Sequence, residues 1–439
     1  MIRSCLCAGA LLLAALPSGP AHAQSPDSSA HAPIHHHDMA GMDMSGMDMS
    51  NMDMSGAYGP YPMTREASGT AWQPDAAPHR GLHVMRGEWM LMLHGDADLV
   101  GDHQGGTRGG DRFFSDNMLM AMAHRPLGPA TIGLRAMLSA EPATIGKAGY
   151  PLLLQTGETA DGKAPLIDRQ HPHDLFMELA TSLAVTRGAG SLFVYGGLPG
   201  EPALGPPAFM HRFTGAVIPE APITHHWLDS THVTFGVLTA GAVWDRAKIE
   251  ASAFRGREPD ENRWNIETPK LDSHSFRLSV NPTDAWALQG SYGRIHSPEQ
   301  LEPDVNQDRL TFSSMRHGHV GETQWEAMLA WGQNRNQPGH TLDAWLLEAS
   351  AEFRERDVIF VRGERVQKDE LFESPDARAG VPFNVGRIAT GYRRSLVRLE
   401  HLDAAIGAMG TILLVPRNLQ DAYGDSRLSG LVFLRCALR

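Results

Sequence analysis

The fold is decided by residues 323–332, TQWEAMLAWG, in which apolar and polar side chains alternate. One face of this segment carries Trp325, Ala327, Leu329 and Trp331. A repeat of two residues is typical of a β-strand with two unlike faces. Trp325 and Trp331 are separated by roughly 20 Å of strand, at about 3.3 Å per residue. This spacing is close to the roughly 25 Å apolar band of a transmembrane barrel strand.

The same alternation recurs along the chain from about Gly81 onward. In residues 345–354, Trp345, Leu347 and Phe353 share one face. In residues 275–280, Phe276 lies on the face opposite Arg277. Such strands suit a soluble β-protein, whose apolar face is core. They also suit a transmembrane barrel, whose apolar face meets lipid and whose polar face lines the lumen.

The links between strands distinguish these alternatives, because long and short links alternate. The long links are predicted at 101–115, 140–172, 197–231, 256–271, 295–308, 333–341, 369–383 and 416–426. The short links are predicted near 125–129, 186–190, 244–247, 281–285, 317–322, 355–357 and 395–403. Outer-membrane barrels combine an even strand number with short periplasmic turns and long external loops. We therefore predict an all-β fold, a closed antiparallel transmembrane β-barrel of about 16 strands, with 14 as the alternative.

In this pattern residues 81–439 resemble the porin-like outer-membrane β-barrels of Gram-negative bacteria. The resemblance implies contact with outer-membrane lipid and passage of a small solute or ion, and it leaves monomer and trimer open. The chain departs from the usual pattern at its end. Such barrels usually finish on an aromatic residue, whereas here Phe433 is followed by LRCALR.

Residues 1–23 have the features of a secretion signal: Arg3, an apolar stretch at 7–15, and small residues around a cleavage site at 21–23. Its removal takes away Arg3 and no acidic residue, so the formal net charge of −12 becomes −13. This charge argues against nucleic acid as a partner. One cysteine, Cys436, remains, which excludes an internal disulfide. No apolar run in the mature chain reaches the roughly 18 residues of a transmembrane helix.

A methionine-rich segment with an internal repeat follows the signal: GMDMS at 41–45, GMDMS at 46–50 and NMDMS at 51–55. Seven of the chain's 21 methionines fall between Met39 and Met54. This composition favours no packed core, so residues 24–80 are interpreted as a disordered arm and linker. Thioethers select Cu(I), and imidazoles suit Cu(II) and Zn(II). The candidate ligands are Met42, Met44, Met47, Met49, Met52 and Met54 for Cu(I), and His35, His36 and His37 for Cu(II) or Zn(II).

The arm resembles the Met/Asp/His-rich amino-terminal region of the outer-membrane copper resistance protein B family. The likeness covers residues 31–56 and rests on MDMS at 42–45, 47–50 and 52–55. It implies copper tolerance at the outer membrane. We expect the arm to lie in the periplasm and to exchange metal with periplasmic metal carriers. The alternative is a passive or structural barrel whose arm only buffers metal.

A second group of candidate metal ligands lies in two of the long links. It comprises His171, His173 and Asp174 in one link, and His211, His225, His226, Asp229 and His232 in the next. If long and short links alternate as predicted, both links lie at the external end of the barrel. There, histidines and carboxylates from adjacent loops could form a transition-metal site. Alternatively the histidines line an aqueous vestibule. The link 197–231, with its six prolines, is also long enough to fold inward and narrow the pore.

Charged residues on the polar strand faces are predicted to line the lumen and to set ion selectivity. They are Arg277, Glu326, Glu348, Glu352, Arg354, Arg387 and Arg393. The alternative is a packed network of ion pairs with little conductance. The charged run from Arg362 to Glu370 is interpreted as a solvated strand end.

Catalytic signatures are poor, because the chain has no G-x-S-x-G, H-E-x-x-H or P-loop motif. We therefore expect no enzymatic activity. The alternative is a membrane-embedded hydrolase that uses a Ser–His pair, such as His274 with Ser275 or His296 with Ser297.

Overall fold

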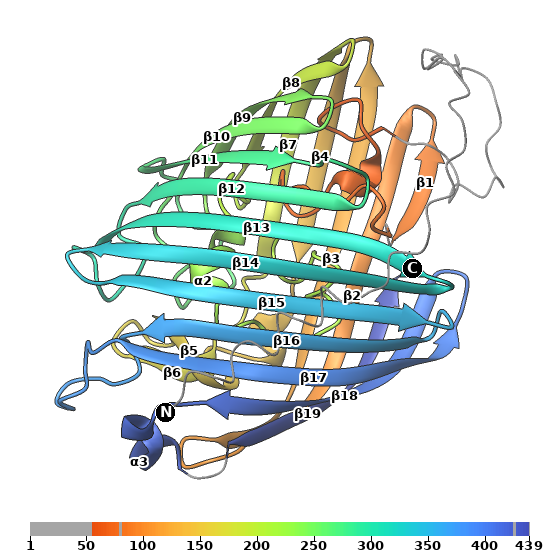
Figure 1. Cartoon of the computed structure of the whole chain (residues 1–439). Helices are drawn as coiled ribbons and strands as arrows, with labels where there is room; N and C mark the ends of the chain where they lie inside the picture. The colour runs from red at the N-terminus through yellow and green to blue at the C-terminus, as the bar shows by residue number, and fades with distance from the viewer. Residues whose placement is uncertain (1–54, 79–80, 425–426, 439) are drawn as a thin grey trace, which may run out of the picture. The chain divides into compact units, whose positions relative to one another are not determined.

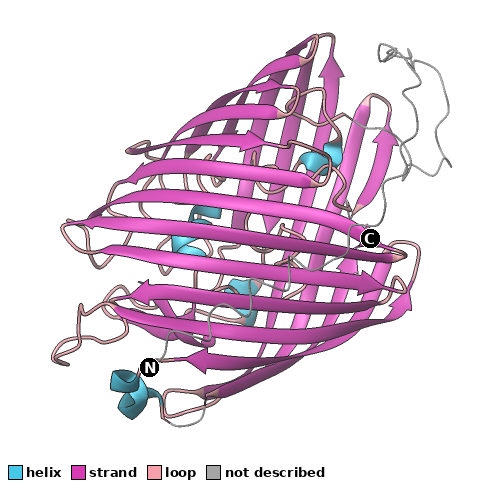
Figure 2. Cartoon of the chain, in the orientation of Figure 1, coloured by secondary structure: helices cyan, strands magenta, loops and turns pink. Residues whose placement is uncertain are grey.

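The computed structural model describes residues 55–78, 81–424 and 427–438. The secretion signal and the metal ligands proposed in the arm, His35 to Met54, lie outside these residues. Sixteen antiparallel strands close into a barrel (Figures 1 and 2), in which each strand pairs with two neighbours. The prediction of sixteen strands is confirmed, and the alternative of fourteen is excluded.

The barrel strands follow one another around the wall in chain order, and the last pairs with the first. They are β2 (Trp89–Gln104), β3 (Gly110–Leu127), β4 (Ala130–Leu138), β7 (Phe176–Arg187), β8 (Gly190–Gly197), β9 (Val237–Trp244), β10 (Ala247–Phe254), β11 (Ser273–Val280), β12 (Trp286–Ile295), β13 (Asn306–Val320), β14 (Thr323–Gln337), β15 (Thr341–Phe353), β16 (Asp357–Lys368), β17 (Phe383–Arg398), β18 (Leu402–Leu414) and β19 (Leu428–Leu438).

Three further strands lie outside this ring. β5 (Tyr150–Thr159) and β6 (Pro165–Gln170) form a separate hairpin. β1 (Leu82–Arg86) pairs with the first residues of β2, from Leu82 opposite Leu93 to Arg86 opposite Trp89. β19 pairs with the same edge of β2 further along, with Ala437 opposite Asp96. One edge of β2 is therefore covered by two strands in succession.

The helices are short. They are α1 (Glu141–Thr144), α2 (His225–Leu228) and α3 (Gln420–Tyr423), with 3₁₀ turns η2 (Met63–Arg65), η3 (Ser230–His232) and η4 (Arg417–Leu419). Among the described residues, none of the helices has the length and apolar character needed to cross a lipid bilayer.

The apolar strand faces point away from the lumen, as predicted. Phe276 and Leu347 are 54% and 37% exposed on the outside of the barrel, whereas Arg277 between neighbouring apolar residues is buried inside. The structure thus excludes two stacked sheets with these apolar side chains between them. An outer surface of this kind is the lipid-facing side of a transmembrane barrel.

The predicted alternation holds for the seven short links and for six of the eight long ones. Seven short turns join strands at one end of the wall, here named the short-turn end, and the six extended links lie at the other, the long-loop end. The predictions of long links at 101–115 and 333–341 are wrong, because the strands extend further than expected and leave only residues 105–109 and 338–340 between them. One prediction on the polar faces is wrong: Arg354 is exposed and has a φ of +53°, because β15 ends at Phe353 and Arg354 belongs to the turn.

Besides the internal hairpin of β5 and β6, two segments fill the barrel interior. The first, residues 55–78, is named the N-terminal segment. Arg65 forms a buried ion pair with Asp75 at 2.6 Å and donates a hydrogen bond to the carbonyl of Asp245, in a short turn. The interpretation of residues 24–80 as disordered therefore does not hold for residues 55–78. The reason is the buried aromatic surface of Tyr58, Tyr61 and Trp72.

The second segment is the link between β8 and β9, residues 198–236, named the plug loop. It folds inward and is buried along almost its whole length. Its Ala208 amide donates to Ser68 Oγ at 2.8 Å, which joins it to the N-terminal segment. Its Ala221 amide donates to Tyr150 of β5 at 3.0 Å, which joins it to the internal hairpin.

Candidate functional site

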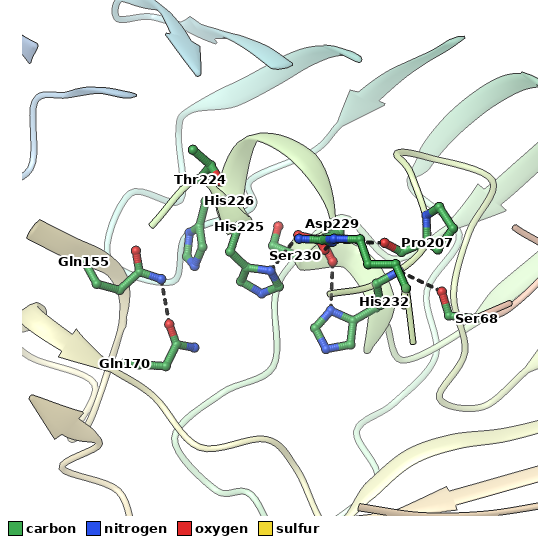
Figure 3. Close-up of polar contacts among 12 residues, drawn as sticks. Ser68, Gln155, Gln170, Pro207, Thr224, His225, His226, Asp229, Ser230 and His232 are labelled. Carbon is green, nitrogen blue, oxygen red and sulfur yellow. Dashed lines mark hydrogen bonds and ion pairs between the residues drawn. The ribbon is translucent and has the colours of Figure 1, made fainter. Parts of the chain in front are cut away.

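Five histidines from two links converge inside the barrel. His171 and His173 follow β6, His225 and His226 begin α2, and His232 ends η3. Figure 3 shows His225, His226 and His232 on the plug loop. The ring centroids of His173 and His232 are 5.2 Å apart, as are those of His225 and His232. All five side chains are buried. The structure therefore brings together five of the six histidines that the sequence singled out in these links.

Four of these imidazoles are held through Nδ1 by an oxygen atom. His173 Nδ1 lies 2.9 Å from Glu141 Oε1, and His225 Nδ1 lies 2.8 Å from Asp229 Oδ1. His232 Nδ1 lies 2.8 Å from the carbonyl of Asp229, and His171 Nδ1 lies 3.2 Å from the carbonyl of Pro172. An oxygen acceptor at Nδ1 places the proton there and leaves the Nε2 lone pair for a metal ion.

For three of these imidazoles, those of His171, His173 and His232, the opposite ring atom has no such partner among the described residues. Within the part of the chain that the structure describes, the Nε2 atoms of His171, His173, His226 and His232 are buried without a hydrogen bond. A cavity of about 10 Å³ is bordered by His171, His173, His225 and His232. That volume holds about one water molecule or ion. Ligand atoms of His171, His225 and His226 also lie within 4.8 Å of one another.

The surroundings keep most of these rings uncharged. Burial lowers the pKa of His171 and His232 well below 6.5, and neighbouring histidines lower it further. Burial also lowers the pKa of His225 to about 4, although Asp229 opposes the shift. His226 differs, because Glu258 and Glu299 outweigh burial and raise its pKa. A neutral imidazole is the form that binds a metal ion.

Asp229 connects the imidazoles to the barrel wall. Its Oδ2 accepts a hydrogen bond from Arg212 at 2.6 Å, and Arg212 Nε donates to Glu348 of β15 at 2.6 Å. Burial alone would raise the pKa of Asp229, but Arg212 and His225 hold it well below its usual range. Asp229 therefore orients His225 and His232, and its second oxygen is used by Arg212.

The remaining predicted ligands lie in other contacts. Asp174 accepts a hydrogen bond from Arg263 at 3.1 Å, so its carboxylate is engaged in an ion pair. His211 Nε2 lies 3.2 Å from Met137 Sδ, and its ring centroid is 6.1 Å from that of His94. His211 therefore belongs to a different group of side chains.

An acidic pocket adjoins the imidazoles on the side of His226. His226, Glu258 and Glu299 have ligand atoms within 4.8 Å of one another, and they border a cavity of about 30 Å³. Glu370 lines the same cavity, and burial together with Glu299 raises its pKa to about 7. Glu258 and Glu299 come from links at the long-loop end. No motif in the sequence marks these carboxylates, because they lie in separate links.

The predicted lumen charges form buried ion pairs. Arg277 pairs with Glu250 at 3.0 Å, Arg387 with Glu220 at 2.9 Å, and Arg393 with Asp403 at 3.3 Å. Glu326 pairs with His317 at 2.9 Å, and Glu352 is half-buried on the same inner face of the wall. These contacts favour the packed network over a wet, selective lumen.

The run from Arg362 to Glu370 is not a solvated strand end, because its alternate residues face inward to the plug loop and the hairpin. Arg362 donates to the carbonyl of Glu220 at 2.9 Å, and Glu364 accepts from the Thr224 amide at 3.0 Å. Lys368 donates to Gln155 at 3.1 Å, and Gln155 bonds to Gln170 in Figure 3. The same two-residue alternation, extended through β16, would have identified Arg362, Glu364 and Lys368 as inward-facing residues.

Comparison with known proteins bears on the fold. No protein-family model and no curated protein sequence matches the chain. Solved structures do match. OmpF of Salmonella typhi, in complex with daunomycin, is 10% identical, with 81% of this chain and 100% of that chain covered and a TM-score of 0.51. OprB of Pseudomonas putida at high pH is 9% identical, with 80% and 94% covered and a TM-score of 0.51. At this identity the likeness shows a shared porin fold.

Proposed function

We propose that this chain is an outer-membrane barrel that handles transition-metal ions, and that the imidazoles of its plug loop and β6 link form the binding site. The outer-membrane location is supported by the porin fold, by the half-exposed Leu, Phe and Trp side chains on the outer wall, and by the secretion signal. An apolar surface of this extent is stable only when lipid covers it.

The observation that carries the metal role is the orphaned Nε2 atoms. A buried polar atom without a hydrogen bond costs about 1–3 kcal/mol. Four such atoms around one region are therefore expensive unless a ligand binds there. Histidines that ligate metals almost always donate their other ring nitrogen to a carboxylate or carbonyl. Glu141 and Asp229 meet that requirement for His173, His225 and His232.

The ligand set favours a borderline ion. Glu158 and Asp174 also border the cavity, but both carboxylates are paired with Arg263. A set of several imidazoles suits Zn(II) or copper better than Mg(II) or Ca(II). His171, His173, His225 and His232 would hold the ion. The acidic pocket beside His226 would attract a cation from the long-loop end, because carboxylates there supply negative charge.

The arm is proposed as a second binding element of the same function. Its support is the sequence alone: the MDMS repeats would bind Cu(I), and His35, His36 and His37 would bind Cu(II) or Zn(II). In the periplasm it would exchange copper with metal carriers there.

Passive passage of small solutes is a second candidate, favoured by the porin fold. The ion pairs that hold the plug loop across the interior count against it.

The metal role is tested by titrating the full-length protein in lipid nanodiscs with Zn(II) against a chromophoric chelator. We expect the double variant His225→Ala/His232→Ala to lose one Zn(II) equivalent. The arm variant His35→Ala/His36→Ala/His37→Ala keeps that equivalent, and so does His274→Ala, which changes an exposed imidazole on the outer wall. Heat-modifiable migration on a denaturing gel shows whether each variant is folded. If the double variant misfolds, His232→Gln replaces it. Unchanged binding in folded plug variants would reject the site.

Conductance in planar bilayers separates the two candidates. Metal handling predicts a small conductance that Zn(II) alters and that His225→Ala/His232→Ala makes insensitive to Zn(II). A large conductance that Zn(II) leaves unchanged would favour passive passage.

A further inference from the structure

Methionines are concentrated in one sector of the barrel interior. Nine of them pack in two touching clusters, here named the methionine line: Met63, Met90, Met92, Met118, Met120, Met122, Met137, Met177 and Met210. From residue 55 onward the chain has four other methionines. Met85 is exposed, and Met315, Met328 and Met409 lie in the large apolar core cluster elsewhere in the barrel.

The strand register places the methionine side chains of neighbouring strands next to one another. Adjacent strands place Met92 of β2 opposite Met122 of β3, and Met120 of β3 opposite Met137 of β4. Met122 packs against both clusters and so joins them. Met118, Met120 and Met122 occupy successive inward positions of β3, while Leu119 and Ala121 between them are exposed on the outer wall.

The methionine line joins two regions of the molecule. Near the imidazoles it packs on Val233, the residue after His232, and its Met210 belongs to the plug loop. His211 Nε2 lies 3.2 Å from Met137 Sδ, so an imidazole of the plug loop already contacts a thioether. At the short-turn end, Met90 lies one residue from the start of β2, and Met63 comes from the N-terminal segment.

Packing alone does not explain the choice of methionine. On β15 and β16 the apolar inward positions are Leu342, Ala344, Leu346, Val358, Phe360 and Val366, which fill the interior without sulfur. A methionine at such an inward position packs little better than these residues do, because its side chain is flexible and tolerates replacement by leucine. Its distinguishing property is the soft thioether, which selects Cu(I) and similar ions.

We propose that the methionine line binds soft monovalent ions, Cu(I) or Ag(I), and conducts them between the imidazoles and the short-turn end. The inference rests on the proposed metal-handling function and names the ion class for it. The ion keeps its oxidation state, since imidazole and thioether both bind the monovalent form. Each step exchanges one neutral sulfur ligand for the next, and no proton or electron is transferred.

Binding is tested by Ag(I) titration of the full-length protein, with silver–sulfur contacts counted by X-ray absorption. The line variant is Met118→Leu/Met120→Leu/Met137→Leu. The matched control, Met315→Leu/Met328→Leu/Met409→Leu, changes three buried methionines outside the line. Both variants keep every methionine of the arm. We expect the line variant to lose at least one Ag(I) equivalent and the control to lose none. Equal binding by both variants would overturn the inference.

Conduction is tested by the rate of Ag(I) entry into vesicles that contain the protein. The line variant should be at least tenfold slower than the control variant, and equal rates would overturn the conduction step. Zn(II) titration of the same proteins separates the two proposals. Loss of an Ag(I) equivalent in the line variant, with Zn(II) binding intact, supports both the imidazole site and the methionine line. Loss of Ag(I) in a protein that never bound Zn(II) supports the methionine line and rejects the imidazole site.

Discussion

The plug loop meets two unlike walls. On one side lie the inward faces of β13, β15, β16 and β17, named the charged wall, where Arg309, Glu348, Arg362, Glu364 and Arg387 contact the loop. On the other side lie β3, β4 and β7 with the methionine line, on which Met210 and Val233 pack.

The two contacts differ in direction and strength. A hydrogen bond to a charged group contributes about 1.5–3 kcal/mol and fixes a geometry. A dispersion contact between two atoms contributes about 0.1–0.2 kcal/mol and favours no one orientation. The charged wall therefore holds the plug loop through directional contacts, whereas the methionine line packs on it without a preferred orientation.

Replacing Arg212 with Met should give the largest effect, because it removes the main contact with the charged wall. The substitution leaves Asp229 and Glu348 buried without this guanidinium. Breaking a buried pair in this way costs about 3–5 kcal/mol. Urea unfolding in vesicles, followed by tryptophan fluorescence, measures the loss. Arg378→Met, which removes exposed pairs with Asp376 and Asp421, is the control and should leave stability unchanged. Equal losses in the two variants would contradict the comparison.

A pH effect is expected where the plug loop meets the N-terminal segment. Glu201 packs against Gly69, and burial raises its pKa to about 8 although Arg277 opposes the shift. The stabilising contribution of a group with a raised pKa is complete below its unfolded pKa and is lost as pH rises through the folded value. Between pH 6 and pH 8 the wild type should therefore lose about 2 kcal/mol, at about 1.4 kcal/mol per pH unit.

Glu201→Gln stays neutral and should show no such loss. Urea midpoints at pH 6, 7 and 8 compare the two proteins. Parallel pH curves would show that Glu201 is not the responsible group.

Gly157→Ala should weaken Zn(II) binding about tenfold, the lower range for disturbing the surroundings of a metal ligand. Gly157 has a φ of +111°, and a Cβ there would lie 2.0 Å from His226 Cε1, so the ring must move. Gly162→Ala is matched: it has a φ of +73° in the same hairpin, and the nearest side-chain atom would be 3.3 Å away. The His226 ring lies beside the rings of His171 and His225, so its movement would disturb these two ligands. Competition titration measures both variants, and equal affinities would show that His226 does not position the ligands.

The smallest effect is expected for Trp227→Phe. It removes the hydrogen bond from Trp227 Nε1 to the carbonyl of Leu342 of β15, which is 3.0 Å long. The loss should be about 1 kcal/mol of unfolding free energy. Ag(I) binding should not change, because this contact belongs to the charged wall. A change in Ag(I) equivalents would mean that the two walls act together.

The barrel could be predicted from the sequence because a strand repeats every two residues. Trp325 and Trp331 fix the outward face of β14 whatever the partner strands are. The lengths of the links then indicate which end of the barrel carries the short turns and which carries the long loops. The loop histidines could be predicted to share one end, because both links follow the same alternation. Their approach to one cavity could not, since it depends on how the plug loop folds.

The inward fold of the link 197–231 was indicated by its length, but the contacts inside the barrel could not be predicted. Arg212 and Glu348 are separated by 136 residues, and no local pattern pairs them. The N-terminal segment was grouped with the arm, although Tyr58, Tyr61 and Trp72 distinguish it. The methionine line had a readable signal. Residues 118–122, MLMAM, place methionine at every second position of a strand.

The shared edge of β2 bears on assembly of the barrel in the bilayer. β1 covers β2 only as far as Leu93, so the backbone groups near Asp96 and beyond lack partners until β19 is added. In hydrocarbon each unpaired backbone group costs several kcal/mol. Release into lipid before β19 has paired with β2 is therefore strongly disfavoured. The N-terminal segment and the plug loop precede β19 in the chain, so both are present when β19 closes the wall.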